Sequence, residues 1–490
     1  MRLGRRPGIY EINTAVWLGN LGRAAGTPIT LDTVPSAEWD RLAELRVDAV
    51  WLMGVWERSP AGLAIALAAP QLRASFQATL PDLSDADVIG SPYCIRAYEL
   101  EPRFGAPAAL ATARAELAAR GRGLILDYVP DHVAPDHAWA TEHPEYFIRG
   151  DEADLEADPT AFLSTAGCVL ANGKDPYFAP WPDVVQLNAF APGLRDAVIE
   201  TLTSIAARCD GVRCDMAMLM TNEVFARTWG ARAGPVPAAD YWPAVIAAVR
   251  GAAPDLLFMA EAYWDMEWTL QQQGFDLCYD KCLYDRLVGG SASSVRGHLQ
   301  AQGDYQERLV RFIENHDEPR AADTFAPDKA RAAAVVMSTV EGARMYHEGQ
   351  LDGAHTHIPV FLARGPQQAP DPGLRAFYDR LLTAVACSGL RDGDWRLCDC
   401  TGWPDNPTAE QLLAWCWDAG GQRHLVVVNL ADQGAQARVR LPWSDLTGRT
   451  WQLRDALNGD EFERDGGELQ CEGLYVAMSA WESYFLELAP

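Results

Sequence analysis

Acidic side chains stand at the ends of four short apolar runs in this sequence. The four stretches are 127–132 (DYVPDH), 211–215 (GVRCD), 259–261 (MAE) and 314–317 (ENHD). A charge inside a strand core is costly unless it is paired. One such acid could simply face solvent at the end of its strand, but four in this order predict a common pocket.

The elements that must position these acids form a repeating pattern. Short apolar runs alternate with helical patterns, and several runs are continuously apolar, as expected for parallel strands covered on both faces. About eight repeats predict an α/β fold, a (β/α)₈ TIM barrel with its active site at the carboxyl ends of the strands. The predicted strands are Ile9–Trp17, Ala49–Met53, Gly123–Val129, Gly211–Asp215, Leu256–Glu261, Leu277–Tyr279, Arg308–Asn315 and Ala343–Tyr346.

Two segments depart from the barrel pattern. Residues 133–188 lack helical periodicity and are rich in Pro, Asp, Tyr and Trp, which predicts an insertion subdomain after the third strand or a disordered loop. After about residue 392 short strands alternate with turns, which predicts a C-terminal all-β sandwich. The predicted domains are therefore a barrel over 1–132 and 189–391, the insertion over 133–188, and the sandwich over 392–490.

The four acidic stretches resemble the four signature regions of the α-amylase superfamily, glycoside hydrolase family thirteen. The first region of that family is Asp-x-Val-x-Asn-His, which this sequence matches except that Asp131 replaces Asn. The second is Gly-Phe-Arg-x-Asp, matched with Val212 in place of Phe; the third supplies Glu261, and the fourth is the Asn-His-Asp of 315–317. The resemblance extends over nearly the whole chain.

The resemblance implies a retaining mechanism with two carboxyl groups. Asp215 would be the nucleophile and Glu261 the general acid/base, while Asp317 would bind sugar hydroxyls and favour a distorted ring. Arg213 lies two residues before Asp215 on the same face of its strand, so it can hold that carboxylate ionised.

The resemblance also implies further residues that would contact the substrate. By motif position, His132 and His316 would hydrogen-bond sugar hydroxyls, although each could instead be a histidine behind the site. Tyr93 stands where the family places a ring that stacks on the sugar, with a core tyrosine as the alternative. Trp264 follows Glu261 closely and could be a stacking subsite. Insertion residues that could stack likewise, or form the insertion's own core, are His143, Tyr177, Phe178 and Trp181.

The sequence also departs from the family's patterns. Cys94 follows Tyr93 where many exo-acting α-glucosidases have Asp, which weakens an exo-α-glucosidase interpretation. Residues 216–219 (MAML) replace the Lys-His that many endo-amylases use for glucan and calcium. Asp131 could be a calcium ligand as a hard oxygen donor, but without those partners we expect no metal and no other cofactor.

Four functions follow from the residues and the resemblance. The first is a retaining α-glycosidase that cleaves α-glucosidic bonds in maltooligosaccharides or related α-glucans. The alternative is a transglycosylase, a glucanotransferase or a sucrose- or disaccharide-active enzyme, that uses the same site. A catalytically dead scaffold would need a membrane anchor and would usually lose the acids, and a different barrel hydrolase matched by chance is a fourth interpretation.

The composition of the chain disfavours some classes of binding partner and indicates a cellular compartment. With 41 Lys and Arg against 67 Asp and Glu, the net charge of −26 disfavours nucleic acid and anionic membranes as partners. We expect an oligosaccharide substrate, with a monomer or a dimer equally compatible. The basic N-terminus lacks a signal-type apolar region, no apolar run is long enough to span a bilayer, and eleven cysteines form no framework. These features predict a cytoplasmic protein.

Overall fold

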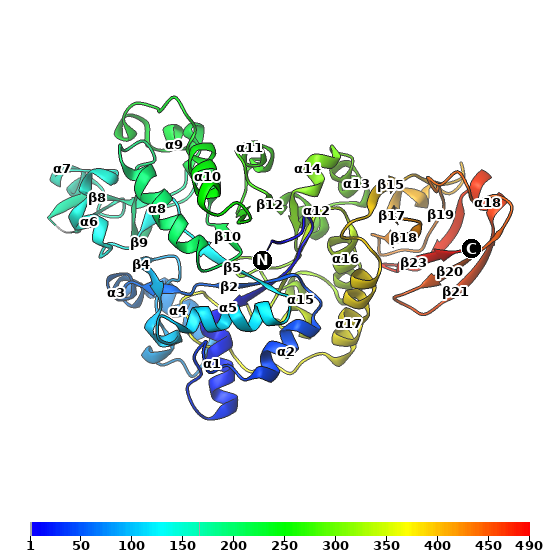
Figure 1. The fold of residues 1–490 in the computed structure, drawn as a ribbon, viewed down its shortest axis with the longest axis horizontal. Helices are drawn as coiled ribbons and strands as arrows, with labels where there is room; N and C mark the ends of the chain where they lie inside the picture. Colours follow the sequence, from blue (N-terminus) through cyan, green and yellow to red (C-terminus); the bar gives the residue numbers. More distant parts are fainter. Residues whose placement is uncertain (1, 166) are drawn as a thin grey trace. The chain divides into compact units, whose positions relative to one another are not determined.

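The computed structural model describes residues 2–165 and 167–490. Eight strands are hydrogen-bonded in the closed order β1-β14-β13-β12-β11-β10-β5-β2, labelled in Figure 1. This confirms the predicted (β/α)₈ barrel. The barrel strands are β1 (Gly8–Asn13), β2 (Ala49–Met53), β5 (Gly123–Tyr128), β10 (Gly211–Cys214), β11 (Leu257–Ala260), β12 (Leu277–Tyr279), β13 (Leu309–Arg311) and β14 (Ala343–His347).

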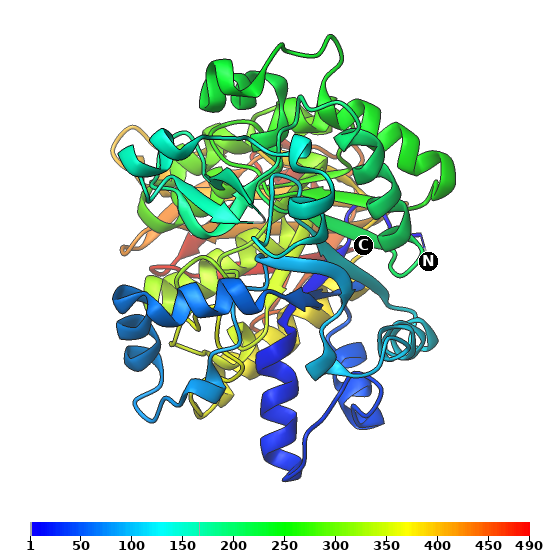
Figure 2. The same ribbon diagram turned by 90° about the vertical axis from the view of Figure 1, so that its left-hand side faces the viewer.

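The first predicted strand is too long. The predicted strand includes residues 14–17, but β1 ends at Asn13. Helix α1 (Thr14–Ala25), the blue helix that extends downward in Figure 2, begins at the next residue. The side chain of Asn13 accepts a hydrogen bond from the backbone N–H of Val16 at 3.3 Å. This cap satisfies a helix donor that would otherwise have no partner, so the apolar residues that follow form a helix.

The seventh predicted strand, Arg308–Asn315, is also too long, because β13 covers only Leu309–Arg311. Past the strand, Asn315 Oδ1 accepts hydrogen bonds from the backbone N–H groups of Asp317 at 2.9 Å and Glu318 at 2.8 Å. This local turn takes the place of the hydrogen bonds to neighbouring strands that would continue β13.

The chain divides into two compact units. One unit holds Ile9–Tyr279 and Thr356–Gln367, and the other holds Gly4–Gly8, Asp280–His355 and Gln368–Pro490. Besides α1, the helices of the first unit are α2 (Ser36–Glu44), α3 (Pro60–Ala68), α4 (Pro70–Thr79), α5 (Ala109–Ala119), α6 (Ala138–Glu142), α7 (Glu152–Ala157), α8 (Leu194–Ala206), α9 (Asn222–Trp229), α10 (Tyr241–Ala252) and α11 (Glu267–Gln272). Those of the second are α12 (Lys281–Gly289), α13 (Ala292–Leu299), α14 (Gly303–Glu307), α15 (Ala321–Thr324), α16 (Pro327–Thr339), α17 (Pro372–Cys387) and α18 (Gly466–Cys471).

The segment predicted as an insertion contains its own antiparallel sheet in the order β6-β9-β8-β7. Its strands are β6 (His132–Val133), β7 (Phe162–Thr165), β8 (Cys168–Gly173) and β9 (Trp181–Gln186). A further pair, β3 (Trp56–Arg58) with β4 (Ile95–Leu100), belongs to the same unit. The domain boundaries stay a prediction, and Met1 and Ala166, which fall within them, lie outside the described residues.

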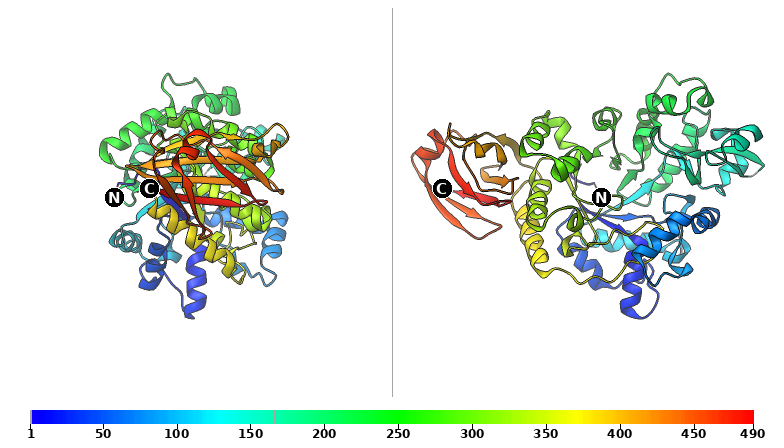
Figure 3. Two further views of the ribbon diagram at one scale, coloured as in Figure 1. Left: turned by 90° about the vertical axis from the view of Figure 1, so that its right-hand side faces the viewer. Right: turned by 180° about the vertical axis from the view of Figure 1, so that it is seen from behind.

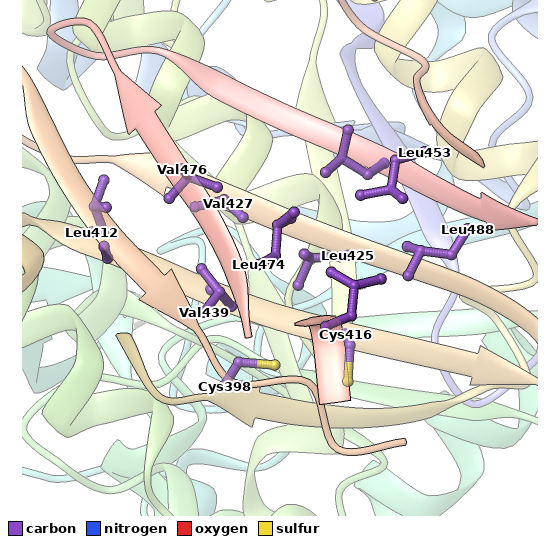
Figure 4. Packing of buried hydrophobic residues seen from close by; sticks show 14 of the residues in the cluster. Cys398, Leu412, Cys416, Leu425, Val427, Val439, Leu453, Leu474, Val476 and Leu488 are labelled. Atoms are coloured by element: carbon purple, nitrogen blue, oxygen red, sulfur yellow. The ribbon is translucent and has the colours of Figure 1, made fainter. Parts of the chain in front are cut away.

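The C-terminal strands form two sheets, in the orders β15-β17-β18-β23-β20-β21 and β16-β19-β22 (Figure 3). Their inward-facing side chains form one apolar cluster that includes Leu425, Val427, Leu453 and Val476 (Figure 4). The predicted C-terminal all-β domain is confirmed. Its strands are β15 (Asp394–Cys398), β16 (Cys400–Thr401), β17 (Leu412–Ala419), β18 (Gln422–Asn429), β19 (Ala435–Val439), β20 (Thr450–Asp455), β21 (Glu461–Asp465), β22 (Leu474–Met478) and β23 (Ser483–Ala489).

Within the second unit, the C-terminal sheet is tied to helix α16. The indole N–H groups of Trp415 and Trp417, both on β17, donate to the backbone carbonyl of Thr339 at 2.9 and 2.8 Å. Thr339 is the last residue of α16, where carbonyls lack intrahelical partners. The two indoles therefore satisfy a buried helix end.

Among the described residues, no helix has the length and apolar character required to cross a membrane.

Candidate active site

Two carboxylates of the first unit follow neighbouring parallel strands. Asp215 comes directly after β10 and Glu261 directly after β11, and the two strands pair with Cys214 opposite Ala260. On the other side of β10, Arg213 lies opposite Asp127 of β5. Because parallel strands bring their carboxyl ends to one edge, both acids leave the barrel at the same edge.

A single guanidinium links the two acids. Arg213 Nη1 is paired with Asp215 Oδ1, and Arg213 Nη2 lies 2.8 Å from Glu261 Oε2. The Arg213 side chain is fully buried, and both carboxylates are buried as well. The guanidinium of Arg213 therefore lies between the two carboxylates.

Aromatic rings surround the same guanidinium. The central carbon of the Arg213 guanidinium lies 5.2 Å from the ring centre of Trp51, 5.3 Å from that of Tyr93 and 5.7 Å from that of Tyr279. Burial lowers the pKa of Arg213, but the nearby Glu261 and Asp215 carboxylates outweigh this and raise the pKa well above its ordinary value. Arg213 therefore stays charged in the folded protein, and cation–π contacts hold it in place.

Glu261 is held by two further donors. The backbone N–H of Met216 donates to Glu261 Oε2 at 2.7 Å, and the hydroxyl of Tyr263 donates to Glu261 Oε1 at 2.9 Å. Tyr263 was not among the predicted site residues. Tyr263 lies outside the four motifs, so no motif position indicates it.

Left-handed backbone conformations follow both acids. Met216 has φ +39°, Trp264 has φ +61° and Asp265 has φ +59°, a region that non-glycine residues adopt at a cost. At Met216 this conformation accompanies the N–H donation to Glu261. Residues with such backbone strain gather at functional sites, and here Met216 directly follows Asp215 while Trp264 comes three residues after Glu261.

His132 carries a second cation near Asp215. Its Nδ1 lies 3.1 Å from Asp131 Oδ2, and its Nε2 lies 3.2 Å from the backbone oxygen of Tyr93. Burial lowers the pKa of His132, but the Asp131 and Asp215 carboxylates overcome this and raise the pKa to about 9. The imidazole is therefore protonated at neutral pH, with both ring nitrogens as donors.

Asp131, His132 and Asp215 together offer three atoms within 4.8 Å of one another that could hold a metal ion. Calcium requires six to eight oxygen ligands, whereas this set offers one imidazole and two carboxylates, and the Asp215 carboxylate is already paired with Arg213. The donor set does not fit calcium.

Asp127, the first acid of its motif, has a structural role. Its Oδ1 accepts from the indole of Trp51 at 3.0 Å and its Oδ2 from the backbone N–H of Gly54 at 2.6 Å. These bonds connect β5 to β2 and to the residue that follows it.

Aromatic side chains from the insertion lie near the segment after β11. The rings of Tyr177 and Trp264 are 4.8 Å apart, and that of Trp181 is 5.3 Å from His132. Tyr177 and Phe178 are 59% and 72% exposed, which argues against a role in a core for either. His143 stacks on Tyr146 at 4.6 Å instead.

The remaining predicted residues lie in the second unit. His316 is buried, and its Nε2 lies 3.1 Å from Asp317 Oδ2, whereas the Asp317 side chain is 44% exposed. The preceding Glu314 accepts from Arg320 Nη1 at 2.6 Å and from the backbone N–H of Ala321 at 2.8 Å. Glu314 therefore supports the turn that carries His316 and Asp317.

Two curated proteins and a set of solved structures are similar to this chain. No protein-family model matches the chain. Over 239 residues, 47% of the chain, it is 23% identical to α-amylase MalA of Haloarcula japonica. Over 182 residues, 36% of the chain, it is 30% identical to an α-1,4-glucan:maltose-1-phosphate maltosyltransferase of Rhodospirillum rubrum. These matches span 32% and 22% of the two relatives' own lengths.

Solved structures match over the full length. The maltogenic α-amylase AmyB of Thermotoga neapolitana has a TM-score of 0.70 at 19% identity, covering 100% of both chains. The α-amylase of Geobacillus thermoleovorans, solved with acarbose, has a TM-score of 0.69 at 17% identity, also covering 100% of both. These structural matches show the fold. With the two sequence matches, they confirm the resemblance to the α-amylase superfamily.

Proposed function

We propose that this chain is a retaining α-glycosidase that cleaves α-glucosidic bonds in maltooligosaccharides or related α-glucans. The observation that carries the proposal is the bridge formed by Arg213 between Asp215 and Glu261. Two carboxyl groups on the two terminal nitrogens of one guanidinium suit the short separation of retaining enzymes, about 5–5.5 Å, rather than the wider gap of inverting ones.

In this proposal Asp215 attacks the anomeric carbon while Glu261 gives a proton to the leaving oxygen. A covalent glycosyl–Asp215 intermediate forms, and the leaving sugar departs as an alcohol. Glu261 then takes a proton from water, whose oxygen bonds to the same carbon and releases Asp215. Arg213, paired with Asp215 Oδ1, holds the attacking carboxylate in place.

Substrate contacts are proposed on the family resemblance and on local geometry. By its motif position His132 would contact a sugar hydroxyl, and its contacts with Asp131 and Tyr93 hold the ring in place. The exposed carboxylate of Asp317 on its fixed turn can accept hydroxyl hydrogen bonds, with His316 beside it. Tyr93 and Trp264 would supply ring faces for the sugar.

The names of the relatives support a glucan as substrate. One is an α-amylase, one transfers maltosyl groups from maltose 1-phosphate to an α-1,4-glucan, and one solved neighbour was crystallised with acarbose. An oligosaccharide is accordingly the partner we propose.

Transfer to a sugar is the second candidate. The exposed Tyr177 ring lies against Trp264, three residues after Glu261, where an acceptor sugar could stack. The maltosyltransferase relative also supports it. Hydrolysis and transfer share the covalent intermediate and differ only in whether water or a sugar hydroxyl resolves it.

The test is incubation with maltose, maltoheptaose, trehalose, sucrose and isomaltose, followed by separation of the products. Asp215→Asn, which keeps the shape and removes the nucleophile, is run beside the parent protein. Glu145→Gln is the matched control, because that carboxylate is 58% exposed on the insertion.

Shorter sugars formed by the parent and by Glu145→Gln, but not by Asp215→Asn, are the expected result. Longer or newly linked sugars would identify a transglycosylase. If the parent turns over none of the five sugars, or if Asp215→Asn equals the parent, the proposal is wrong.

A further inference from the structure

Trp181 of the insertion lies beside the histidine of the candidate site. Its ring centre is 5.3 Å from that of His132, and the two ring planes are tilted by 59°. Trp181 begins β9 and pairs with Gly173 on β8. A Cβ atom on Gly173 would lie 3.0 Å from Trp181 Cε3 and 3.4 Å from His132 Cβ. Because glycine has no side chain, the indole and the imidazole can approach each other here.

The indole of Trp181 is supported by apolar side chains. The ring is partly buried and packs against a small buried cluster of Cys94, Ala134 and Val184. The thiol of Cys94 donates a hydrogen bond to the backbone carbonyl of Asp183 at 3.0 Å, so its proton is directed to the insertion. Packing of this kind fixes the ring while part of it stays accessible. An accessible aromatic ring held in this way suits the C–H face of a sugar.

The strand order places His132 on the side of Asp215 that is remote from Glu261. Three neighbouring barrel strands have the order β11-β10-β5; Glu261 follows β11, Asp215 follows β10, and His132 comes after β5. A ring nitrogen of His132 and a carboxylate oxygen of Asp215 lie within 4.8 Å of each other. Trp181, in contact with His132, therefore lies at the Asp215 end of the carboxylate pair.

The proposed reaction gives the two ends of the carboxylate pair different sugars. The leaving sugar receives its proton from Glu261, whereas the retained sugar becomes bound to Asp215. Further glucose units of the retained chain extend away from the leaving group. With His132 at the first retained sugar, Trp181 comes next along the retained chain.

We propose that Trp181 is a specificity-determining residue that stacks on the second glucose unit of the retained chain. The enzyme therefore prefers bonds that have at least two glucose units on the Asp215 side, and it releases single glucose units slowly. The inference rests on the proposed glycosidase function and extends it by naming the length of chain that the site retains.

Two fluorides test this inference, because they share one leaving group and differ by one retained glucose unit. They are α-glucosyl fluoride and α-maltosyl fluoride. For the parent protein we expect kcat/KM to be about 10-fold or more higher for α-maltosyl fluoride, since the second unit adds binding energy. Asp215→Asn is run beside the parent protein to measure the spontaneous release of fluoride.

Trp181→Leu keeps an apolar side chain against the cluster but removes the flat ring. Its kcat/KM for α-maltosyl fluoride should fall about 10-fold, while that for α-glucosyl fluoride should stay within about twofold. Trp181→Phe, which keeps a smaller ring, should lose less and is the second variant if Trp181→Leu does not fold. Trp403→Leu is the matched control, because that indole is 38% exposed in the C-terminal domain and should change neither value. Thermal unfolding verifies that each variant is folded.

An equal loss on both fluorides would mean that Trp181 only supports His132. No loss on either, or a parent protein that cleaves both fluorides equally well, would mean that no second glucose unit stacks on the indole. Each of these results overturns the inference and leaves the proposed function intact. If the parent protein releases fluoride from neither compound faster than Asp215→Asn does, the proposed function itself fails, and this inference falls with it.

Discussion

At the residue scale, Arg213 lies between two carboxylates and three aromatic rings with its side chain fully buried. Removing its charge leaves two buried acids without their shared partner. We predict that Arg213→Met lowers the free energy of unfolding by about 3–5 kcal/mol, because a broken buried ion pair leaves an uncompensated charge. Urea unfolding measures this, with the exposed Arg449→Met as the control. A loss no larger than that of the control would contradict the pairing.

The Asp131–His132 pair makes stability depend on pH. The pKa of His132 is raised from 6.5 to about 9, so its contribution to stability is fully present below pH 6.5 and is lost as pH rises through about 9. We expect the melting temperature of the parent protein to fall over this interval. Asp131→Asn removes the carboxylate that pairs with the imidazole, so its decline should be smaller. If the melting temperatures of the two proteins decline equally with pH, Asp131 and His132 do not form a charged pair.

At the element scale, the Asn13 cap separates β1 from α1. Its side chain accepts the N–H of Val16, and N-cap bonds of this kind stabilise by about 1 kcal/mol. Asn13→Ala should therefore lower the free energy of unfolding by about that amount, while Asn13→Asp, which keeps the acceptor, should cost less. Chemical denaturation of both variants decides this, and equal losses would argue against the cap.

Element boundaries were the least predictable feature. Apolar residues predominate on both sides of Asn13, so hydrophobicity alone does not reveal that this residue ends a strand and starts a helix. At the seventh strand, the turn made by Asn315 ends the ladder although Phe312 and Ile313 are apolar and buried. In both cases a short polar side chain that bonds to the backbone overrides the apolar pattern.

At the scale of the whole molecule, the strand–helix alternation was sufficient to predict the barrel, and the short strands between turns after about residue 392 were sufficient to predict the C-terminal sheets. Motif positions were sufficient to place Arg213, Asp215 and Glu261 together, because Arg213 lies in β10 and the two acids directly follow the neighbouring parallel strands β10 and β11. They could not reveal the Tyr263 hydroxyl on Glu261, because Tyr263 lies outside the motifs, or the Met216 N–H, because Met216 has a positive φ that no motif indicates.

The central claim is that Asp215 becomes covalently bound to the sugar. Incubation with 5-fluoro-α-D-glucosyl fluoride slows the release of such an intermediate, and mass spectrometry of the digested protein then locates it. We predict a glycosyl adduct on the peptide that carries Asp215, and none in Asp215→Asn. Turnover of the reagent with no adduct, or an adduct on the peptide of Glu261 or Asp317 instead, would contradict the account.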